Sequence, residues 1–426
     1  MKTEEHDLVI IGGGPAGMAA AIAASDFGVN SLVLERDKEL GGILQQCIHP
    51  GFGLHVFDEE LTGPEFGERY KDKVLGTNAE IRLETIVTDI DATKKITVYH
   101  PEQGLYYIKA SVIILTMGAR ERTRGAIRIP GGRPAGVYTA GLAQRLINIE
   151  GKMPGKEYVI LGSGDIGMIM ARRLSLEGAK VHKVVEILPY PSGLLRNKVQ
   201  CLDDFGIPLL LSHTITHIHG NDRLEAVTIA QVDEKWQPIP GTEETVPCDT
   251  LLLSVGLIPE IDFALGTGIE LSSTGGPVVN EMLETTVPGI FACGNVLHIH
   301  DLVDNVVLEG AKAGAAAAKY LREERTGEGD ELPVVPGEGV LYVLPQKIQK
   351  NSLEEQQMVH LRVRKPAKKL HLGVFSGDRL LKKSRFAFAM PSEMITLNVG
   401  PFEQEQICDV GLEVRVISME DHKYEV

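Results

Sequence analysis

The sequence contains few cysteines and no pair of them at a redox spacing. Their number is odd, no C-x-x-C or C-x-x-x-x-C occurs, and they are scattered through the 426 residues at Cys47, Cys201, Cys248, Cys293 and Cys408. This distribution excludes a disulfide framework and argues against dithiol-disulfide exchange within the chain. We therefore expect reduced thiols, which are typical of a cytoplasmic protein.

The sequence also lacks a long uninterrupted hydrophobic run and a basic stripe with interleaved aromatic residues. The apolar run Leu8–Ala24 is broken by Gly-Gly-Gly-Pro and is shorter than the roughly 20 residues of a membrane span. A net charge of -15 argues against a nucleic-acid partner. The acidic start, MKTEEHD, leads straight into an apolar segment, so we expect no signal peptide, no integral membrane segment and a cytoplasmic location.

A glycine-rich motif near the N-terminus has the form of a dinucleotide-binding turn. A strand predicted over Asp7–Ile11 precedes glycines in the G-x-G-x-x-G register at Gly12, Gly14 and Gly17. These glycines allow a tight turn, close approach of a pyrophosphate and close helix packing, and the helix N-terminus attracts phosphate. The next predicted strand, SLVLE, ends at Glu35, whose carboxylate can accept hydrogen bonds from ribose hydroxyls.

A second turn of the same kind follows the strand predicted over Tyr158–Leu161. Its glycines are Gly162, Gly164 and Gly167, and the next predicted strand, KVHKVVE, ends at Glu186. A carboxylate there would repel a 2′-phosphate, so we expect NADH to be preferred over NADPH, although Arg196 and Lys198 follow and can still reach a phosphate. Two such turns in one chain indicate electron transfer between two nucleotide cofactors.

The order of these turns resembles the two-dinucleotide-binding-domain flavoproteins of the pyridine nucleotide-disulfide oxidoreductase family. Four further motifs share the resemblance: VIILTMGAR at 112–120, TLLLSVGLIPE at 250–260, the Gly41-Gly42 pair and TTVPGIFACGNVLH at 285–298. The last departs from the family at Asn295, where an aspartate usually hydrogen-bonds the ribityl chain of FAD. The resemblance implies FAD and NAD(H) as cofactors.

The same resemblance implies two sets of cofactor-binding residues. For FAD they are Gly12, Gly14, Pro15, Ala16, Gly17, Glu35, Arg36, Gly41, Gly42, Val87, Thr116, Gly118, Gly294 and Asn295. For NAD they are Gly162, Gly164, Asp165, Ile166, Gly167, Glu186 and Gly256.

The expected fold is α/β, with two Rossmann-like three-layer dinucleotide-binding domains and a small C-terminal all-β domain. The FAD domain is expected to be discontinuous, over 1–120 and 285–328, because the late flavin motif follows an inserted NAD domain at 153–284. Residues 121–152 read as a linker with a docking helix. Apolar and polar residues alternate between Gly and Pro residues within 329–426, which predicts a small β-sandwich.

Two shorter resemblances concern partners. GVYTAGLAQ resembles flavoprotein subunits of opine, sarcosine and hydrogen-cyanide-forming dehydrogenases, and GGILQQCIHPGFG followed by LTGPE resembles flavoproteins encoded beside glycerol-3-phosphate dehydrogenase-like proteins. Both imply that the electron partner is a second flavoprotein subunit, and we expect an oligomer. The C-terminal region lacks the long helical patterns of the disulfide reductases' dimerisation domain, so dimerisation of that type is not expected.

Cys47 and His49 are the candidate catalytic residues. A thiol beside an imidazole can be a thiolate at neutral pH, which would suit a stand-alone NADH oxidase or peroxidase. The alternative is a buried structural cysteine with a histidine that hydrogen-bonds a backbone carbonyl. A non-catalytic protein that binds nucleotides for assembly also stays open.

A polar cluster, NVLHIHDLVDN, follows the late flavin motif. Its residues His298, His300 and Asp301 could bind a metal only with a further ligand from elsewhere, so we expect no metal site. We expect instead that Asp301 or Asp304 caps the following helix. One of the histidines could also donate a hydrogen bond to the charge of reduced flavin.

Overall fold

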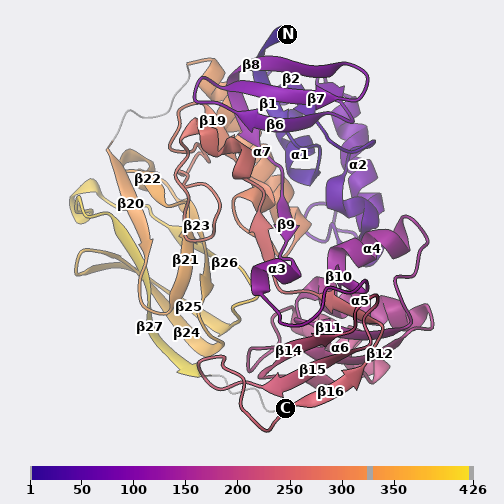
Figure 1. Cartoon of the computed structure of the whole chain (residues 1–426). Coiled ribbons are helices and arrows are strands. Elements are labelled where there is room, and N and C mark those ends of the chain that lie inside the picture. The colour runs from indigo at the N-terminus through magenta and orange to yellow at the C-terminus, as the bar shows by residue number, and fades with distance from the viewer. Residues whose placement is uncertain (1, 324–329, 422–426) are drawn as a thin grey trace. The chain divides into compact units, whose positions relative to one another are not determined.

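The computed structural model describes residues 2–323 and 330–421, and the chain divides into two compact units (Figure 1). Among the described residues, the first unit contains 2–119 and those from Pro259 to Asp421, and the second contains Arg120–Ile258. Within the described residues, no helix combines the length and apolar composition needed to cross a membrane.

The first unit is built on a seven-stranded sheet of order β5-β2-β1-β8-β7-β6, with β19 paired to β8. Its centre is parallel, because β1 (Thr3–Ile11) lies between β2 (Ser31–Leu34) and β8 (Gly104–Leu115). The remaining strands are β5 (Glu80–Arg82), β6 (Ile86–Ile90), β7 (Lys95–His100) and β19 (Ile290–Ala292). The β1 strand begins four residues earlier than the sequence predicts and ends where expected.

Two helices pack closely beside this sheet, α1 (Pro15–Asp26) and α7 (Val303–Leu321). A Cβ atom at Gly310 would lie 2.4 Å from the Ala16 carbonyl oxygen, and one at Gly314 would lie 2.2 Å from that of Ala20. The contact itself therefore requires glycine at these two positions of α7. A third helix, α2 (Gly63–Leu75), begins with a capping box between Thr62 and Glu65.

The second unit contains a parallel sheet of order β10-β17-β11-β12-β13 and an antiparallel sheet of order β14-β15-β16. The strands of the parallel sheet are β10 (Val137–Thr139), β11 (Glu157–Leu161), β12 (Lys180–Val185), β13 (Leu209–Leu210) and β17 (Thr250–Leu253). Those of the antiparallel sheet are β14 (His213–His219), β15 (Ala226–Gln231) and β16 (Glu244–Pro247). The helices are α3 (Arg124–Ile127), α4 (Ala140–Asn148), α5 (Asp165–Leu176) and α6 (Leu195–Cys201).

Two sequence-based boundaries differ from these units. The segment expected to be a linker, 121–152, supplies β10 and α4 to the second unit, where Ala143 and Ile147 are buried with Tyr158. The chain returns to the first unit at Pro259 rather than at 285. The reason is packing, because Ile261, Ala264 and Leu283 are buried in the first unit's hydrophobic core.

The C-terminal strands form two sheets of order β22-β20-β27-β24-β25 and β21-β23-β26. They share one hydrophobic core, so the predicted β-sandwich is present, and it lies within the first unit. Its strands are β20 (Glu331–Pro336), β21 (Val340–Leu344), β22 (Lys347–Gln349), β23 (Gln357–Val363), β24 (Ala367–Ser376), β25 (Arg379–Ala389), β26 (Ile395–Val399) and β27 (Leu412–Asp421).

Candidate functional site

The first glycine turn is shaped by contacts that exclude side chains at two of its three glycines. Gly12 has φ +109°, and a Cβ there would lie 2.7 Å from the Thr116 carbonyl oxygen. A Cβ at Gly17 would lie 1.9 Å from the carbonyl oxygen of Gly12, whereas one at Gly14 would meet no atom within 4 Å. Gly14 is thus the open point of the turn, and α1 begins there without a side-chain cap. An anion can approach the helix N-terminus at this point.

Glu35 and the Gly41-Gly42 pair converge on the same turn. The buried Glu35 carboxylate accepts hydrogen bonds from the backbone N–H of Gly13 at 2.6 Å and of Asp37 at 2.7 Å. The N–H of Gly41 donates to the Gly13 carbonyl oxygen at 2.9 Å, and a Cβ at Gly42 would lie 3.2 Å from the Cα of Gly14. These predicted FAD residues therefore gather around one backbone turn.

Four more predicted FAD residues border this turn or its strands. The hydroxyl of Thr116 lies 2.8 Å from the carbonyl oxygens of both Ile11 and Gly12. Gly294 has φ +75°, and a Cβ there would lie 2.9 Å from the Cβ of Ala16, at the start of α1. Gly118 follows β8 with φ +72°. Two others lie elsewhere on the sheet: Arg36 is exposed just after β2, and Val87 is half-buried in β6 opposite Val98.

The second glycine turn repeats this construction, with Ser254 in the place of Thr116. A Cβ at Gly162 would lie 2.0 Å from the Ser254 carbonyl oxygen, and the Gly167 N–H donates to the Ser254 hydroxyl at 3.1 Å. Asp165, the first residue of α5, accepts hydrogen bonds from Leu194 N–H at 2.8 Å and Asn197 Nδ2 at 2.6 Å. The other predicted NAD residues are Gly164 at the start of α5, the partly buried Ile166, and Gly256 with φ +96°.

Glu186 is buried at the end of β12 and accepts four hydrogen bonds. Its Oε2 receives the N–H of Ser163 at 2.9 Å, the hydroxyl of Ser163 at 2.6 Å and the hydroxyl of Ser192 at 2.7 Å. Its Oε1 receives the N–H of Leu188 at 3.0 Å. The carboxylate is therefore fixed beside the glycine turn. The two serines were missed from the sequence, although Ser163 stands inside the G-x-G spacer.

The late flavin motif ends in a buried network centred on Glu309 of α7, which sequence reasoning also missed. Glu309 Oε2 accepts the Gly294 N–H at 2.5 Å, and its Oε1 lies 3.1 Å from His298 Nε2. His300 Nε2 lies 3.5 Å from Glu309 Oε2. Burial alone would raise the pKa of Glu309, but the imidazoles of His300 and His298 hold that pKa well below its usual range. Asn295 Oδ1 faces inward and accepts the His300 N–H at 3.0 Å.

The β-sandwich contacts this network through Arg362 of β23. Its guanidinium donates to the Ile299 carbonyl oxygen at 3.0 Å, to the Tyr342 hydroxyl at 3.2 Å and to the Asp301 carboxylate. The Tyr342 hydroxyl in turn lies 3.3 Å from Nδ1 of His298. The sandwich is thereby joined to the loop that follows the late flavin motif.

The expected helix cap by Asp301 or Asp304 is wrong. Leu302 is the N-cap of α7 and makes no side-chain cap hydrogen bond. Asp301 pairs with Arg362 and accepts the Met394 N–H at 2.6 Å. Asp304 is buried and accepts hydrogen bonds from the backbone N–H of Gly53 and of residues near it. Both carboxylates therefore contact segments distant in the sequence, and neither caps the helix.

Cys47 and His49 lie in the segment that follows the Gly41-Gly42 pair. Cys47 is partly exposed as a residue, yet burial of the thiol raises its pKa to about 12. Nδ1 of His49 lies 3.0 Å from the Pro50 carbonyl oxygen, and its ring packs on Phe52 with centroids 5.0 Å apart. A pKa of about 12 keeps the thiol protonated at neutral pH, so the expected thiolate is not supported.

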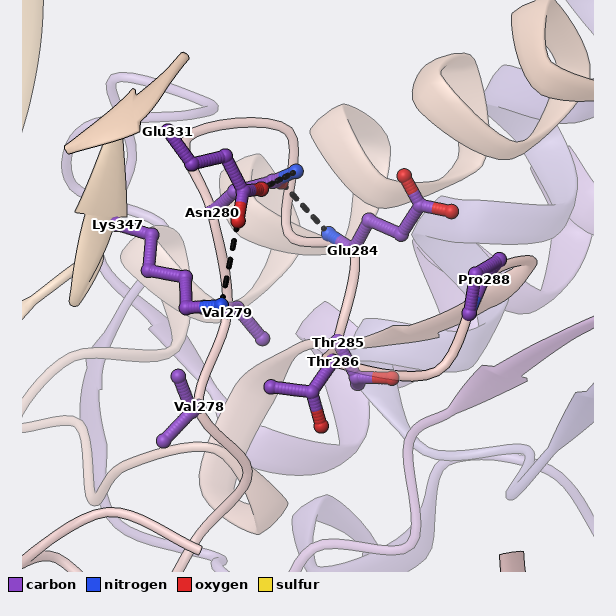
Figure 2. A pocket seen from close by; sticks show the side chains of 9 residues that line it. All are labelled: Val278, Val279, Asn280, Glu284, Thr285, Thr286, Pro288, Glu331 and Lys347. Carbon is purple, nitrogen blue, oxygen red and sulfur yellow. Dashed lines mark hydrogen bonds and ion pairs between the residues drawn. The ribbon is translucent and has the colours of Figure 1, made fainter. Parts of the chain in front are cut away.

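A separate hollow lies on the first unit between the 278–288 segment and the strands β20 and β22. Figure 2 shows Glu331 and Lys347 turned toward each other across it, with their charged atoms 3.2 Å apart, and Asn280 beside them. Asn280 Oδ1 accepts the N–H groups of Met282 and Glu284. None of its lining residues belongs to either glycine turn, and its charged pair is already satisfied.

Comparison with known proteins gives a family match over most of the chain. The sequence profile described as pyridine nucleotide-disulphide oxidoreductase matches residues 6–317. Hydrogen cyanide synthase subunit HcnB of Pseudomonas protegens is 28% identical over 62% of this chain, and one of the subunits of opine oxidase from Agrobacterium tumefaciens is 24% identical over 68%. The matched parts span only 59% and 61% of those two relatives.

Among solved structures, thioredoxin reductase of T. acidophilum superposes with a TM-score of 0.62 at 23% identity. The match covers 76% of this chain and 100% of that one. At this identity the likeness concerns the fold alone.

Proposed function

The chain belongs to the pyridine nucleotide-disulphide oxidoreductase family, and on that basis we propose that it is an FAD-dependent oxidoreductase that takes hydride from NADH. Members of this family bind FAD and NAD(P)H. The observation that carries the proposal is the pair of glycine turns, one in each unit, each with a buried carboxylate at the end of the next strand. We assign the turn of the first unit to FAD and the turn of the second unit to NADH.

The first unit fits FAD. The open position at Gly14 leaves room for a pyrophosphate, and the positive end of the α1 dipole favours it. Glu35 is available to ribose hydroxyls beside the turn it organises. The same turn is closely approached by Gly41, Gly42 and Gly294, which have no side chain that would obstruct the nucleotide. Asn295 would present its Nδ2 donor, since its Oδ1 is engaged by His300.

The second unit fits NADH better than NADPH. The Glu186 carboxylate is held beside the turn by Ser163 and Ser192, so its negative charge cannot swing away from a 2′-phosphate. Lys198 is paired with Asp203 at 3.0 Å, which reduces the charge it can offer to that phosphate. Repulsion by Glu186 therefore dominates the preference.

When both cofactors are bound, a hydride carries two electrons and one proton from the nicotinamide to the flavin and leaves NAD⁺. The residues of the chain bind and orient the two nucleotides, and no acid or base of the chain is needed for that transfer. Their contribution is placement and electrostatics.

We further propose that the electrons leave for a second flavoprotein subunit. HcnB and the opine oxidase relative are both named as subunits of larger enzymes. A thiol route is less favoured, because Cys201 and Cys248 of the second unit are buried and burial raises their pKa values to about 11 and 12. The β-sandwich beyond the family match at residue 317 offers additional surface for such a partner.

Two alternatives make different predictions. A stand-alone NADH oxidase or peroxidase that uses Cys47 would lose turnover in Cys47→Ser while flavin reduction persists. The raised pKa of Cys47 counts against it. A non-catalytic nucleotide-binding protein would hold flavin that NADH cannot reduce.

The test is anaerobic stopped-flow absorbance of the purified chain, mixed first with NADH and then with NADPH. Rapid bleaching of the oxidised flavin band by NADH, and much slower bleaching by NADPH, is expected. Bound flavin that neither nucleotide bleaches would overturn the proposal for the isolated chain. Fast turnover of an organic substrate by the chain alone would overturn the partner proposal only.

A further inference from the structure

We propose that His298, His300 and Glu309 form a binding site for one divalent transition-metal ion of the zinc and iron class. Two of these residues belong to the loop after the late flavin motif, and the third comes from α7. The sequence lacked a ligand from elsewhere to complete His298 and His300, and Glu309 supplies it. The inference rests on side-chain geometry and is independent of the proposed electron transfer.

The distances match a coordination sphere. The candidate ligand atoms all lie within 4.8 Å of one another. His298 Nε2 lies 3.1 Å from Glu309 Oε1, and His300 Nε2 lies 3.5 Å from Glu309 Oε2. Metal bonds of about 2.1 Å in a tetrahedron place ligand atoms about 3.4 Å apart. An ion between these atoms therefore requires only small side-chain shifts.

The ring nitrogen that would not bind the metal, Nδ1, has a hydrogen-bond partner in both imidazoles, as is usual for metal ligands. His300 Nδ1 lies 3.3 Å from Asn295 Oδ1, and His298 Nδ1 lies 3.3 Å from the Tyr342 hydroxyl. Asn295 Oδ1 also accepts the His300 backbone N–H, which identifies that atom as the amide oxygen. His300 Nδ1 therefore donates to Asn295, and the other ring nitrogen, Nε2, faces Glu309. A metal ion between these atoms would be bound by the Nε2 lone pair and a carboxylate oxygen.

Burial and charge also suit a cation. The side chains of His298, His300 and Glu309 are 0%, 2% and 7% exposed. Of the nearby cations, Arg362 pairs with Asp301, and Lys312 is attracted to both Glu281 and Glu309 while burial lowers its pKa. Two imidazoles with one carboxylate are ligands that zinc and ferrous iron both accept, and three ligands leave a position for water.

The test uses the full chain with its flavin, stripped by a chelator and titrated with Zn²⁺ by calorimetry and with Co²⁺ by visible absorbance. One ion per chain and tetrahedral Co²⁺ bands are expected. His298→Gln and His300→Gln each remove a ligand and should weaken Zn²⁺ binding by more than about 100-fold. Asn295→Ala removes the hydrogen-bond partner of His300 and should weaken Zn²⁺ binding by about 10- to 100-fold.

The matched control is His360→Gln. His360 belongs to the same cluster, with its ring centroid 6.1 Å from that of His298, but its Nδ1 is bonded to the Thr396 hydroxyl and it offers no ligand atom to the group. This variant should bind Zn²⁺ as the parent chain does. Circular dichroism verifies folding in each variant, because Asn295 is itself a proposed FAD residue and flavin content alone would not separate the two effects.

The proposal is overturned if the parent chain binds no Zn²⁺ at stoichiometric concentrations. It is also overturned if a folded His298→Gln/His300→Gln double variant binds Zn²⁺ as tightly as the parent. In either case the cluster is a hydrogen-bonded network of the two imidazoles with Glu309. Neither result changes the expected reduction of flavin by NADH, so the two proposals fail separately.

Discussion

The carboxylate of Asp304 accepts the backbone N–H of His55 at 3.0 Å, which joins two residues 249 positions apart in the chain. The same carboxylate accepts the N–H groups of Val56 at 2.9 Å and Gly53 at 3.2 Å. The first turn of α7 therefore anchors the loop that follows Cys47. This contact holds two flavin-motif segments together across the first unit.

Replacing Asp304 by Ala should leave these three N–H groups without their acceptor. The expected loss in the free energy of unfolding is about 2–4 kcal/mol, because the site is buried and the acceptor is charged. Urea unfolding of the purified chain measures it. Asp304→Asn keeps one acceptor oxygen and should lose less. Equal stability of Asp304→Ala and the parent chain would refute the anchoring role.

Two glycines of the first turn should respond differently to a side chain. Gly14→Val places its Cβ where no other protein atom lies within 4 Å, so the fold should survive while bound FAD falls at least about tenfold. Gly17→Ala puts a Cβ 1.9 Å from a carbonyl oxygen, so it should lower stability by about 1–3 kcal/mol or more. Flavin content and thermal unfolding of both variants give the comparison. Full FAD occupancy in Gly14→Val would contradict the assignment.

Nucleotide preference should depend on the charge of Glu186. Glu186→Gln keeps an acceptor oxygen for its neighbours and removes the negative charge, so the ratio of NADPH to NADH efficiency should rise about tenfold, or about 1.4 kcal/mol. Ser192→Ala is the control, because it deletes one hydrogen bond and keeps the charge. An unchanged ratio in Glu186→Gln would mean that the ribose 2′-hydroxyl of NADH does not bind beside Glu186.

Cys47 should be a slow thiol below pH 12. Alkylation of the folded chain at pH 8, read by peptide mass spectrometry, should label Cys408, which is exposed, long before Cys47. The raised pKa means that the folded state keeps this proton longer than the unfolded chain does. Its contribution to stability is therefore complete below about pH 8.5 and is lost as the pH rises toward 12. Cys47→Ala should weaken that alkaline loss. Labelling of Cys47 as fast as Cys408 would support the oxidase alternative instead.

Sequence patterns were sufficient to predict those features whose geometry is set within one short segment. The glycine turns, the strands beside them and Glu35 and Glu186 were predicted because each depends on spacing within about 25 residues. The equivalent hydroxyls of Thr116 and Ser254 also stand at the same place in two matching motifs, LTMG and LSVG.

Contacts between distant segments could not be read in the same way. Glu309 stands 15 residues after Gly294 inside an ordinary helical pattern, and only the crossing of α7 with the late motif brings it to His298. Arg362 is likewise one of several basic residues in alternating strands. Its contact with Asp301 exists because, within the first unit, the sandwich packs against the loop that follows the late flavin motif.

The central claim is that one chain holds two nucleotides in separate turns, and the most direct test is anaerobic flavin reduction in Gly164→Val. A Cβ at Gly164 would lie 3.1 Å from the Ser254 hydroxyl and 3.6 Å from its carbonyl oxygen. Turning the hydroxyl away costs its hydrogen bond from the Gly167 N–H, so the variant should fold with somewhat lower stability. The account predicts parental FAD content, full bleaching by dithionite and bleaching by NADH at least about 100-fold slower than in the parent chain. Bleaching by NADH at the parental rate would contradict it.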